Sequence, residues 1–333
     1  MPSLIVRLPN HLGDACMALP ALERLAAAGP IACAGQPWAA DLLRATGWPV
    51  LALPGGRGAR LAALRRWRAQ HPADRQALLL TNSFSSALEF RLAGWRPAGY
   101  ARDGRGLLLQ PAYRVPQEWS GAMHMIEYYD RLARSWLGTA PPSAAGERAM
   151  PRLALAAQAR DRAGAALART AAGAIAAAGY VVLCPVARGR HRGRDKCWDG
   201  FGRLGQALRQ RGERVVVCPG PAEAEAARAA VPDAQLLEAL ELDAFAALLA
   251  GSRLVVANDS GPAHLAAAVG AKVVVVFGVT DPAKTGPRGA GVHGIGGAAR
   301  WPDYAAVAAL AEGLLGGPAA TGAATVLPAG AAA

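Results

Sequence analysis

Short apolar runs alternate along the chain with longer segments in which apolar residues recur every three or four positions. The short runs are typical of buried strands, and the longer segments are typical of amphipathic helices. In the first half this pattern predicts three strand and helix pairs: 3–8 with 13–28, 49–53 with 57–70, and 76–81 with 84–93. A repeated strand-then-helix order favours a parallel sheet covered by helices.

The second half resumes the alternation after a segment of different composition. Residues 139–152 follow a helix predicted over 122–137 and are rich in Pro, Gly, Ala and Ser, which predicts a linker. Beyond it the pattern predicts, in order, strand 180–185, helix 198–211, strand 214–219, helix 221–230, helix 242–250, strand 253–257, helix 261–269, strand 272–278 and helix 303–315. We therefore expect two domains, 1–138 and 153–316, and a low-complexity tail at 317–333.

Composition narrows the class of protein. Hydrophobic residues make up 53% and charged residues 18% of the chain, yet no uninterrupted apolar run reaches the roughly 18 residues that span a bilayer. The first residues enter a strand-like run without a basic leader, which predicts no signal peptide and a cytoplasmic location. Any contact with the inner membrane is expected to be peripheral, electrostatic and sensitive to salt.

Charge and cysteine content exclude two further classes. The net charge of +12 favours anionic partners such as phosphorylated substrates. Because the arginines are scattered and no aromatic-basic reading motif accompanies them, we expect no nucleic acid partner. The cysteines form neither a C-x-x-C pair nor a Cys/His spacing typical of a metal site, so we expect reduced thiols and no bound metal.

Candidate chemistry is expected in loops that follow strands, because ligands of open parallel sheets bind beyond the carboxyl ends of the strands. The first such loop holds Asn10, His11, Gly13 and Asp14. Gly13 permits a tight turn or the close approach of a ligand, and Asp14 lies at the start of the next helix. An aspartate in a first helical turn is also favoured by capping and by the helix dipole, so a structural role stays open for it.

Basic side chains crowd the second loop, which follows the strand at 180–185. They are Arg188, Arg190, Arg192, Arg194 and Lys196. Such a loop is either solvated or binds an anion such as a diphosphate. Lys196 stands out because the chain otherwise uses Arg almost throughout, and an ammonium group favours a point-charge contact with phosphate.

The third loop follows the strand at 253–257 and begins with Asn258 and Asp259. Ser260 and Gly261 precede Pro262, which suits the first turn of a helix. Free amides at a helix start beside glycine form an anion site, so we interpret this loop as a phosphate cradle, with an ordinary N-cap as the alternative. Asp259 would repel a phosphate, and we therefore expect it to orient the loop or to contact a sugar hydroxyl.

Two more strand ends carry polar residues. Thr280 and Lys284 lie on a Gly/Pro-rich loop at 278–289 and are expected to line the same binding site as the loop at 258–262. Glu223 follows the strand at 214–219, where a carboxylate can accept two hydrogen bonds from a ribose diol. A solvated helix face is the alternative for Glu223.

Together these segments resemble glycosyltransferase family 9, the ADP-heptose heptosyltransferases of lipopolysaccharide core assembly. The resemblance covers residues 3–315 and is most specific in "NDSGPAHLAAAVGAKVVVVFGVTDPAKTGP", "GDACMALPAL", "LTNSFSSALEFRLAG" and Lys196-Cys197-Trp198. The segment Asn82–Leu88, "NSFSSAL", is most similar to the heptosyltransferase II branch.

The resemblance implies an α/β GT-B fold, in which two Rossmann-like doubly wound domains flank a cleft. It implies an acceptor site on the first domain and an ADP-sugar site on the second. The implied reaction is metal-independent and inverting, needs no cofactor, and moves L-glycero-D-manno-heptose from ADP-heptose to an inner-core acceptor of the heptosyl-Kdo-lipid A type. Arginines of the first domain are then expected to meet anionic groups of that acceptor; they include Arg91, Arg96, Arg102 and Arg105.

The resemblance also implies roles for individual residues. Asp14 matches the catalytic base, Lys196 the phosphate-binding lysine, Glu223 the ribose carboxylate, and Leu240 the apolar contact with adenine. The residues implied around the diphosphate are Asp259, Ser260, Gly261 and Ala263, and the further cleft candidates are Asn10, Gly13, Asn82, Ser83, Arg188, Thr280 and Lys284. The loop after Pro185 departs from the family pattern, because it reads "VARGRHRGRD" in place of a Gly-Ala start.

Three alternatives remain at this point. The same fold can act on a protein or a small-molecule acceptor, or it can bind a nucleotide sugar without turnover. A dinucleotide oxidoreductase is disfavoured, because no G-x-G-x-x-G follows the first strand.

Overall fold

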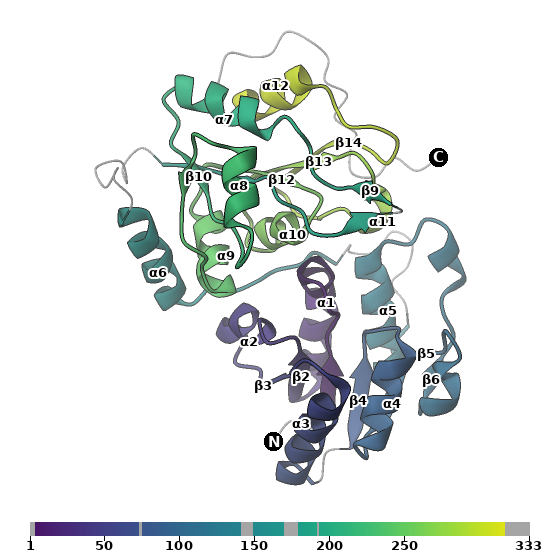
Figure 1. Ribbon diagram of the computed structural model, residues 1–333. Helices are drawn as coiled ribbons and strands as arrows, with labels where there is room; N and C mark the ends of the chain where they lie inside the picture. The colour runs from purple at the N-terminus through teal and green to yellow at the C-terminus, as the bar shows by residue number, and fades with distance from the viewer. Residues whose placement is uncertain (1–3, 73–74, 141–148, 170–178, 192, 317–333) are drawn as a thin grey trace. The chain divides into compact units, whose positions relative to one another are not determined.

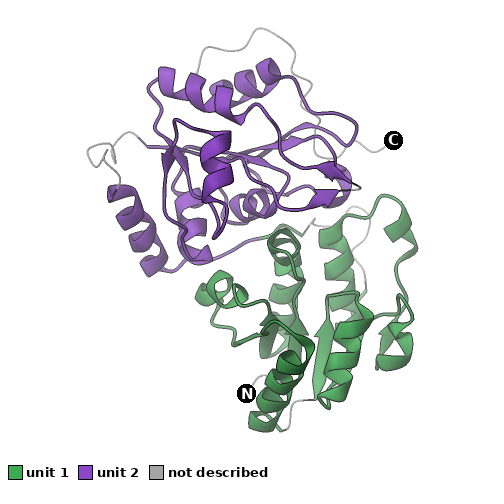
Figure 2. Ribbon diagram, in the orientation of Figure 1, with its two compact units in different colours: residues 1–151 green, residues 152–333 purple. Residues whose placement is uncertain are grey.

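The computed structural model describes residues 4–72, 75–140, 149–169, 179–191 and 193–316 (Figure 1). The chain divides into two compact units, unit 1 over residues 1–151 and unit 2 over residues 152–333 (Figure 2). The division falls at the end of the segment 139–152 that the sequence predicts to be a linker. Most of that segment and the predicted tail 317–333 lie outside the described residues.

Unit 1 is built on a parallel sheet in the order β3-β2-β1-β4-β5-β6. Its strands are β1 Leu4–Arg7, β2 Ile31–Gly35, β3 Val50–Ala52, β4 Gln76–Leu79, β5 Arg96–Tyr100 and β6 Ala112–Tyr113. Its α-helices are α1 Leu12–Ala28, α2 Ala39–Leu42, α3 Arg57–Gln70, α4 Phe84–Leu92 and α5 Met125–Leu137, and short 3₁₀ turns lie at 44–46, 105–108 and 117–120.

The two faces of this sheet pack against different helices, because successive strand residues point to opposite sides. Ile5 and Leu79 pack with Leu64 of α3 and Phe90 of α4 in one buried cluster. On the other side α1 and α5 lie against each other (Figure 1). Asp130 of α5 ties those two helices, since its carboxylate pairs with Arg24 of α1 at 2.6 Å and also with an arginine one turn along α5.

Unit 2 repeats the architecture with the order β11-β10-β7-β12-β13-β14. Its sheet strands are β7 Val181–Cys184, β10 Val215–Val217, β11 Gln235–Leu236, β12 Leu254–Asn258, β13 Val273–Phe277 and β14 Val292–Gly296, and β8 Arg190–His191 pairs with β9 Arg194–Asp195 in a separate antiparallel hairpin. Its helices are α6 Ala157–Ala168, α7 Phe201–Gln210, α8 Ala224–Ala230, α9 Leu242–Ala250, α10 Gly261–Ala268, α11 Pro282–Thr285 and α12 Tyr304–Leu314.

Valine-rich strands explain the core of unit 2, since a parallel sheet buried on both faces favours continuous apolar runs. Leu183 and Val256 pack with Phe201 of α7 and Val307 of α12 on one face. Helices α9 and α10 lie together with α6 on the other side (Figure 1). Arg162 of α6 donates to an α9 carboxylate there at 2.5 Å.

Both sheets have the strand order 3-2-1-4-5-6 when each unit is numbered from its own first strand. This confirms the predicted fold class of two Rossmann-like doubly wound sheets. In such a sheet the order in which strands are added reverses between the adjacent first and fourth strands, and ligands bind beyond the carboxyl ends of these two strands. Those strands are β1 and β4 in unit 1, and β7 and β12 in unit 2.

The structure differs from the predicted elements where the hydrophobic pattern is weak. The strands β2, β5 and β14 carry Ala, Gly or Pro at positions where β-branched residues would signal a strand, and pairing with neighbours in the sheet decides their conformation. Helix α7 begins at Phe201 and α8 at Ala224, each three residues after the predicted start. No helix among the described residues has the length and apolar character required to cross a bilayer.

Candidate active site

Loops 8–11 and 80–83 leave the switch point of unit 1 side by side, because β1 and β4 are adjacent strands. Arg7 is paired in register with Leu79, so Asn10 and Asn82 each lie three residues beyond the same step of the ladder. The sheet therefore brings the polar residues after both strands to one edge. Gly13 and Asp14 follow directly in the first turn of α1.

Asp14 is half-buried in that first turn, and the N-cap of α1 is His11, whose side chain makes no capping bond. Its charge reaches two buried neighbours. Burial raises the pKa of the Cys16 thiol to about 12, and the Asp14 carboxylate adds to that shift. Burial likewise raises the pKa of Tyr129 of α5, again with a contribution from Asp14. The carboxylate thus lies near the side of α1 that faces α5. The dipole of α1 stabilises a negative charge at this end of the helix.

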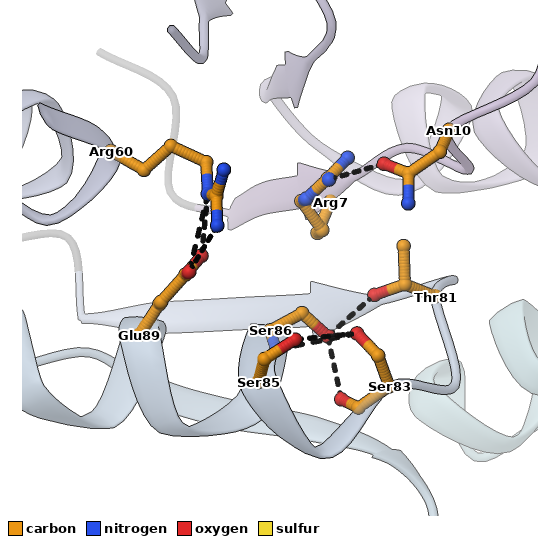
Figure 3. Close-up of polar contacts among 8 residues, drawn as sticks. All are labelled: Arg7, Asn10, Arg60, Thr81, Ser83, Ser85, Ser86 and Glu89. Atoms are coloured by element: carbon orange, nitrogen blue, oxygen red, sulfur yellow. Dashed lines mark hydrogen bonds and ion pairs between the residues drawn. The ribbon is translucent and has the colours of Figure 1, made fainter. Parts of the chain in front are cut away.

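Ser83 has a structural role that the sequence left unassigned. Its Oγ accepts from the Ser86 amide at 3.3 Å as the N-cap of α4 and donates to the Ser86 hydroxyl at 3.0 Å. Thr81 shares a hydrogen bond of 2.8 Å with the same Ser86 hydroxyl, and Ser85 donates to Ser83 at 3.4 Å (Figure 3). This chain of hydroxyls fixes the turn after β4 and accounts for Ser83 as a cap.

A buried arginine underlies the loop after β1. Burial lowers the pKa of Arg7 to about 10, a shift that the Glu89 carboxylate opposes and the Arg60 guanidinium reinforces. Arg60 donates to Glu89 through hydrogen bonds of 2.6, 3.0 and 3.2 Å (Figure 3). Arg7 donates to the Leu8 carbonyl and, at 2.6 Å, to Oδ1 of Asn10. Arg7 stays charged at neutral pH and orients Asn10.

Asn82 is held by two donors. Tyr128 of α5 donates to its Oδ1 at 3.0 Å, and Arg105 donates to the same atom at 3.4 Å. Arg105 is fully buried and also donates to the carbonyls of Tyr100 and Thr81. The expectation that Arg105 meets an anionic acceptor is therefore wrong, because its guanidinium is used inside unit 1 to join the ends of β4 and β5.

Asn258 organises the switch point of unit 2. Its fully buried amide donates to the Pro185 carbonyl at 2.7 Å and accepts from the Trp198 amide at 2.9 Å. These two bonds join both ends of the loop between β7 and α7 to the end of β12. The asparagine at the end of β12 therefore sets the position of the basic loop that contains Lys196.

Most of the basic side chains in that loop have partners within unit 2. Arg188 pairs with Glu223 at 2.6 Å, Arg190 pairs with Asp195 at 3.1 Å, and Arg194 donates to the Gly278 carbonyl at 3.1 Å. Arg192 lies outside the described residues. Lys196 is half-buried, and among the described residues its ammonium makes no hydrogen bond, although its charge acts on Asp259.

Asp259 is nearly fully buried after β12, with its Oδ1 3.7 Å from Nε2 of His264 in α10. Burial alone would raise the pKa of Asp259, but His264, Thr280 and Lys196 together hold it below its usual value. At hydrogen-bond distance, within the part of the chain described, neither Oδ1 of Asp259 nor Oγ1 of Thr280 has a partner. Buried polar atoms without partners are rare and often mark a place for a ligand or water.

The start of α10 fits the predicted cradle only in part. The Ala263 amide donates to the Ser260 carbonyl at 3.1 Å and is not open to a ligand, and Pro262 has no N–H. Within the described residues the amides of Ser260 and Gly261 make no backbone hydrogen bond. Ser260 does not cap the helix with its side chain; its hydroxyl donates to the Asn258 carbonyl at 3.2 Å instead. Ser260 is thus the N-cap of α10 by position, as the alternative had it, but without a capping bond from its side chain, and the two amides have no backbone partner among the described residues.

The match to a known family covers most of the chain. A family model described as "Glycosyltransferase family 9 (heptosyltransferase)" matches residues 64–309. The chain belongs to glycosyltransferase family 9.

Individual proteins that are similar to this chain are heptosyltransferases, and the similarity covers different shares of their length. The chain is 37% identical over 112 residues to lipopolysaccharide heptosyltransferase 3 of Escherichia coli K12, a match that covers 31% of each protein. The similarity thus spans about a third of the length of the curated relatives that it matches. Among solved structures, E. coli ADP-heptose lipopolysaccharide heptosyltransferase II shares the fold with a TM-score of 0.74, 23% identity and coverage of 95% of this chain and 98% of that one.

A second similar structure contains a nucleotide. The E. coli heptosyltransferase WaaC with ADP matches with a TM-score of 0.66 and 22% identity, over 93% of this chain and 99% of that one. Both structural likenesses confirm the predicted GT-B class of two α/β units.

The remaining candidates of this family 9 chain are placed as follows. Glu223 lies at the start of α8, where one carboxylate oxygen binds Arg188 and the other accepts from the Gly220 amide at 3.0 Å. Leu240 is half-buried, with its backbone next to the Cys218 thiol after β10. Lys284 is exposed on α11. These roles stay predictions for the family 9 site.

Sequence reasoning assigned no role to Tyr128 in unit 1 or to Asn258 and His264 in unit 2, which contact candidate residues or loops of their own units. Asn258 and His264 lie within the segment "NDSGPAHL", so both could have been considered as candidates from the sequence. Only the fold shows that the His264 imidazole lies beside Asp259. Tyr128 comes from α5, far along the chain from Asn82, and no local pattern indicates that contact. Among the described residues, no group of His, Cys, Asp and Glu side chains is arranged to hold a metal ion.

Proposed function

We propose that this family 9 member transfers a heptose from ADP-heptose to an acceptor in the inner core of lipopolysaccharide. One observation carries the proposal: in the loops after β7, β12 and β13, the described residues include an ammonium group without a hydrogen bond, two amides without a backbone partner, and two buried oxygens without a hydrogen bond. That set offers positive charge to a diphosphate and polar contacts to a sugar. The names of the relatives, which include an ADP-bound heptosyltransferase, support the choice of donor.

Unit 2 binds the donor in this proposal. Lys196 and the amides of Ser260 and Gly261 contact the diphosphate, since open amides at a helix start favour anions. Thr280 and Asp259 offer Oγ1 and Oδ1 to sugar hydroxyls, and burial of the Asp259 carboxylate beside His264 keeps it away from the phosphates. Glu223 and Leu240 are assigned to the ribose and the adenine.

Unit 1 binds the acceptor and supplies the base. The acceptor hydroxyl oxygen attacks the anomeric carbon of the heptose, the carbon–oxygen bond to ADP breaks, and ADP leaves with the bonding electrons. Asp14 takes the proton of the acceptor hydroxyl, which is general-base help worth about 10²- to 10⁴-fold in rate. Attack from the face opposite the leaving group inverts the anomeric configuration.

The charge of the leaving ADP is met by protein groups in this scheme. Preorganised donors aimed at developing charge are among the strongest contributions to catalysis. Lys196 has that role here, and the proposal requires neither a metal ion nor a cofactor.

The proposal is tested with the purified full chain. ADP binding is measured by calorimetry, and transfer is measured by mass spectrometry with ADP-heptose and a truncated core saccharide that ends in a heptosyl-Kdo unit. We expect ADP to bind, the saccharide to gain the mass of one heptose, and ADP to be released in equal amount. ADP release that depends on donor but not on saccharide would contradict the assigned acceptor.

Two further arms separate the alternatives. A protein extract and a set of small alcohols replace the saccharide in the same assay, and heptose addition to either would move the acceptor to that class. ADP-heptose that binds without turnover under every acceptor would assign the chain to the non-catalytic binding modules.

A further inference from the structure

Two asparagines follow the two central strands of unit 1, β1 and β4, in the same arrangement. Asn10 and Asn82 each lie three residues beyond the paired residues Arg7 and Leu79. In each amide, Oδ1 accepts from an arginine: Arg7 donates to Asn10 at 2.6 Å, and Arg105 donates to Asn82 at 3.4 Å. We propose that these two amides bind oxygen atoms of the acceptor saccharide through their Nδ2 groups.

The arginines determine which way each amide faces. A guanidinium has only N–H donors and no acceptor, so the amide atom that meets it has to be the oxygen. The Nδ2 group of each asparagine then points away from its arginine as a donor with two N–H groups. Figure 3 shows the nitrogen of Asn10 directed toward the turn after β4 that carries Thr81.

The two arginines hold these orientations firmly. Burial of the Arg105 guanidinium leaves it no freedom, because it also donates to the carbonyls of Tyr100 and Thr81. Arg7 is similarly buried and donates to the Leu8 carbonyl as well. Each amide is thereby preorganised, which reduces the entropy that a ligand loses on binding.

Tyr128 adds a second anchor to Asn82. Its hydroxyl donates to Oδ1 at 3.0 Å, and its ring lies 4.2 Å from Trp119 and 4.5 Å from Tyr100 between ring centroids. These contacts keep the tyrosine in place. We class Tyr128, Arg7 and Arg105 as positioning residues, because they act through the asparagines.

Both Nδ2 groups are available to a ligand. Asn10 is exposed and Asn82 is half-buried, and across the described part of the chain no acceptor receives a hydrogen bond from either. The two amides therefore supply hydrogen-bond donors beside the Asp14 carboxylate, at the edge where ligands of doubly wound sheets bind. These donors select groups rich in acceptor oxygens, which are the hydroxyl and carboxylate oxygens of a saccharide. This inference rests on the proposed function and adds the residues that select its acceptor.

The decisive variants are Asn10→Asp and Asn82→Asp. Each keeps an oxygen for its arginine but replaces the donor with an acceptor that carries charge. Loss of a hydrogen bond to a charged or strongly polar group changes affinity by about 10- to 100-fold. We expect each variant to raise the KM and the Kd for the inner-core saccharide by that factor, while the KM for ADP-heptose changes less than about twofold.

A matched control comes from the same unit. Gln70→Glu makes the same change from amide to carboxylate on an exposed side chain at the last residue of α3, which precedes β4 and so lies away from the carboxyl edge of the sheet. It should leave all constants at their wild-type values. Tyr128→Phe removes one anchor of Asn82 and should raise the saccharide KM by less than Asn82→Asp, with kcat at saturating saccharide near that of the wild type.

Two saccharides identify the oxygen that is bound. The native inner-core saccharide is compared with one whose carboxylates have been reduced to alcohols. A variant effect that disappears with the reduced saccharide assigns the amides to a carboxylate, and an effect that persists assigns them to hydroxyls.

Failure of this inference is distinct from failure of the proposed function. Heptose transfer by the wild-type chain tests the function, whereas calorimetry of the saccharide with ADP present tests the asparagine pair without turnover. The inference is overturned if both Asn→Asp variants keep the wild-type thermal midpoint and bind the saccharide with Kd within twofold of wild type. A wild-type chain that binds no saccharide overturns it as well.

Discussion

Unit 1 and unit 2 share one strand order but differ in the loop that follows the first strand. In unit 1 only residues 8–11 separate β1 from α1, so the helix begins directly at the edge of the sheet and places Asp14 there. In unit 2 residues 185–200 separate β7 from α7 and include the β8–β9 hairpin. The long loop is attached by Asn258 and carries Lys196.

The two edges consequently offer different chemistry from the same scaffold. Unit 1 presents a helix-borne carboxylate and two oriented amides, whereas unit 2 presents an ammonium group, open backbone amides and a buried carboxylate beside an imidazole. A short loop suits a base that must be held rigidly, and a long loop suits the enclosure of a charged ligand. This contrast agrees with the proposed assignment of acceptor and base to unit 1 and donor to unit 2.

The largest expected effect is on kcat, and it tests whether Asp14 of unit 1 acts in catalysis without affecting ADP binding to unit 2. Asp14→Asn removes the base without changing side-chain size and should lower kcat by about 10²- to 10⁴-fold. Calorimetry should give an unchanged ADP affinity, and Asp233→Asn, an exposed aspartate of unit 2, serves as control. A kcat within a factor of three of the wild-type value would remove Asp14 from the mechanism.

The next effect concerns the donor edge alone. Lys196→Ala should weaken ADP binding by about 10- to 100-fold, because a hydrogen bond to a charged group contributes about 1.5–3 kcal/mol. Lys272→Ala is the matched control, since that exposed lysine of unit 2 donates to the Leu314 carbonyl. Equal ADP affinities for the two variants in calorimetry would show that the basic loop does not hold the diphosphate.

A smaller effect concerns the pH dependence of stability and distinguishes the buried Asp259 of unit 2 from Asp14 of unit 1. The folded pKa of Asp259 lies below its ordinary value of 3.8, so the ionised group stabilises the fold above that pH, and this contribution is lost as the pH falls through the folded pKa. The difference in Tm between wild type and Asp259→Asn should therefore be steady above about pH 4 and change as the pH falls through the folded pKa. Scanning calorimetry from pH 3 to pH 7 measures it; a difference that is constant over the range would contradict the depressed pKa.

The smallest effect uses thiol reactivity as a local probe of unit 2. Burial raises the pKa of Cys16 and Cys33 to about 12 and that of Cys218 to about 11, and it raises the pKa of Cys184 further, whereas Cys197 is exposed beside Lys196. Since the thiolate is the reactive form, a maleimide at pH 7.5 should modify Cys197 first.

Bound ADP should slow that modification several-fold, and peptide mass spectrometry would follow it. Equal rates with and without ADP would place the nucleotide away from the 185–200 loop. Rapid modification of Cys16 in unit 1 would contradict its burial against α5.

Several features of the site were predictable because they depend on local pattern. The strands predicted at 3–8, 180–185 and 253–257 end within one residue of the ends of β1, β7 and β12, because each is a short apolar run, and a parallel sheet places the carboxyl ends of its strands at one edge. Asp14 in the first turn of α1 followed from helical periodicity. Lys196 was indicated by the choice of lysine in a chain that prefers arginine.

Other features were not predictable, because they depend on contacts between distant segments. Arg105 was expected to face a ligand, yet its guanidinium is buried among the carbonyls of Thr81 and Tyr100. Ala263 was expected to offer an amide, yet the first turn of α10 uses it. Charge and residue type are visible along the chain, whereas burial and hydrogen-bond partners are decided by the fold.

The sequence by itself determined the alternation of strands and helices, the family, and the loops in which the candidate chemistry lies, because hydrophobic periodicity and short motifs are local properties. Only the tertiary structure decided which polar groups in those loops remain open. Side chains from α5 and the turn at 105–108 fix Asn82, and β12 fixes the loop after β7. A hydrogen-bonding group is available to a ligand only where the folded chain leaves it without a partner, and that condition is set by residues far away in the sequence.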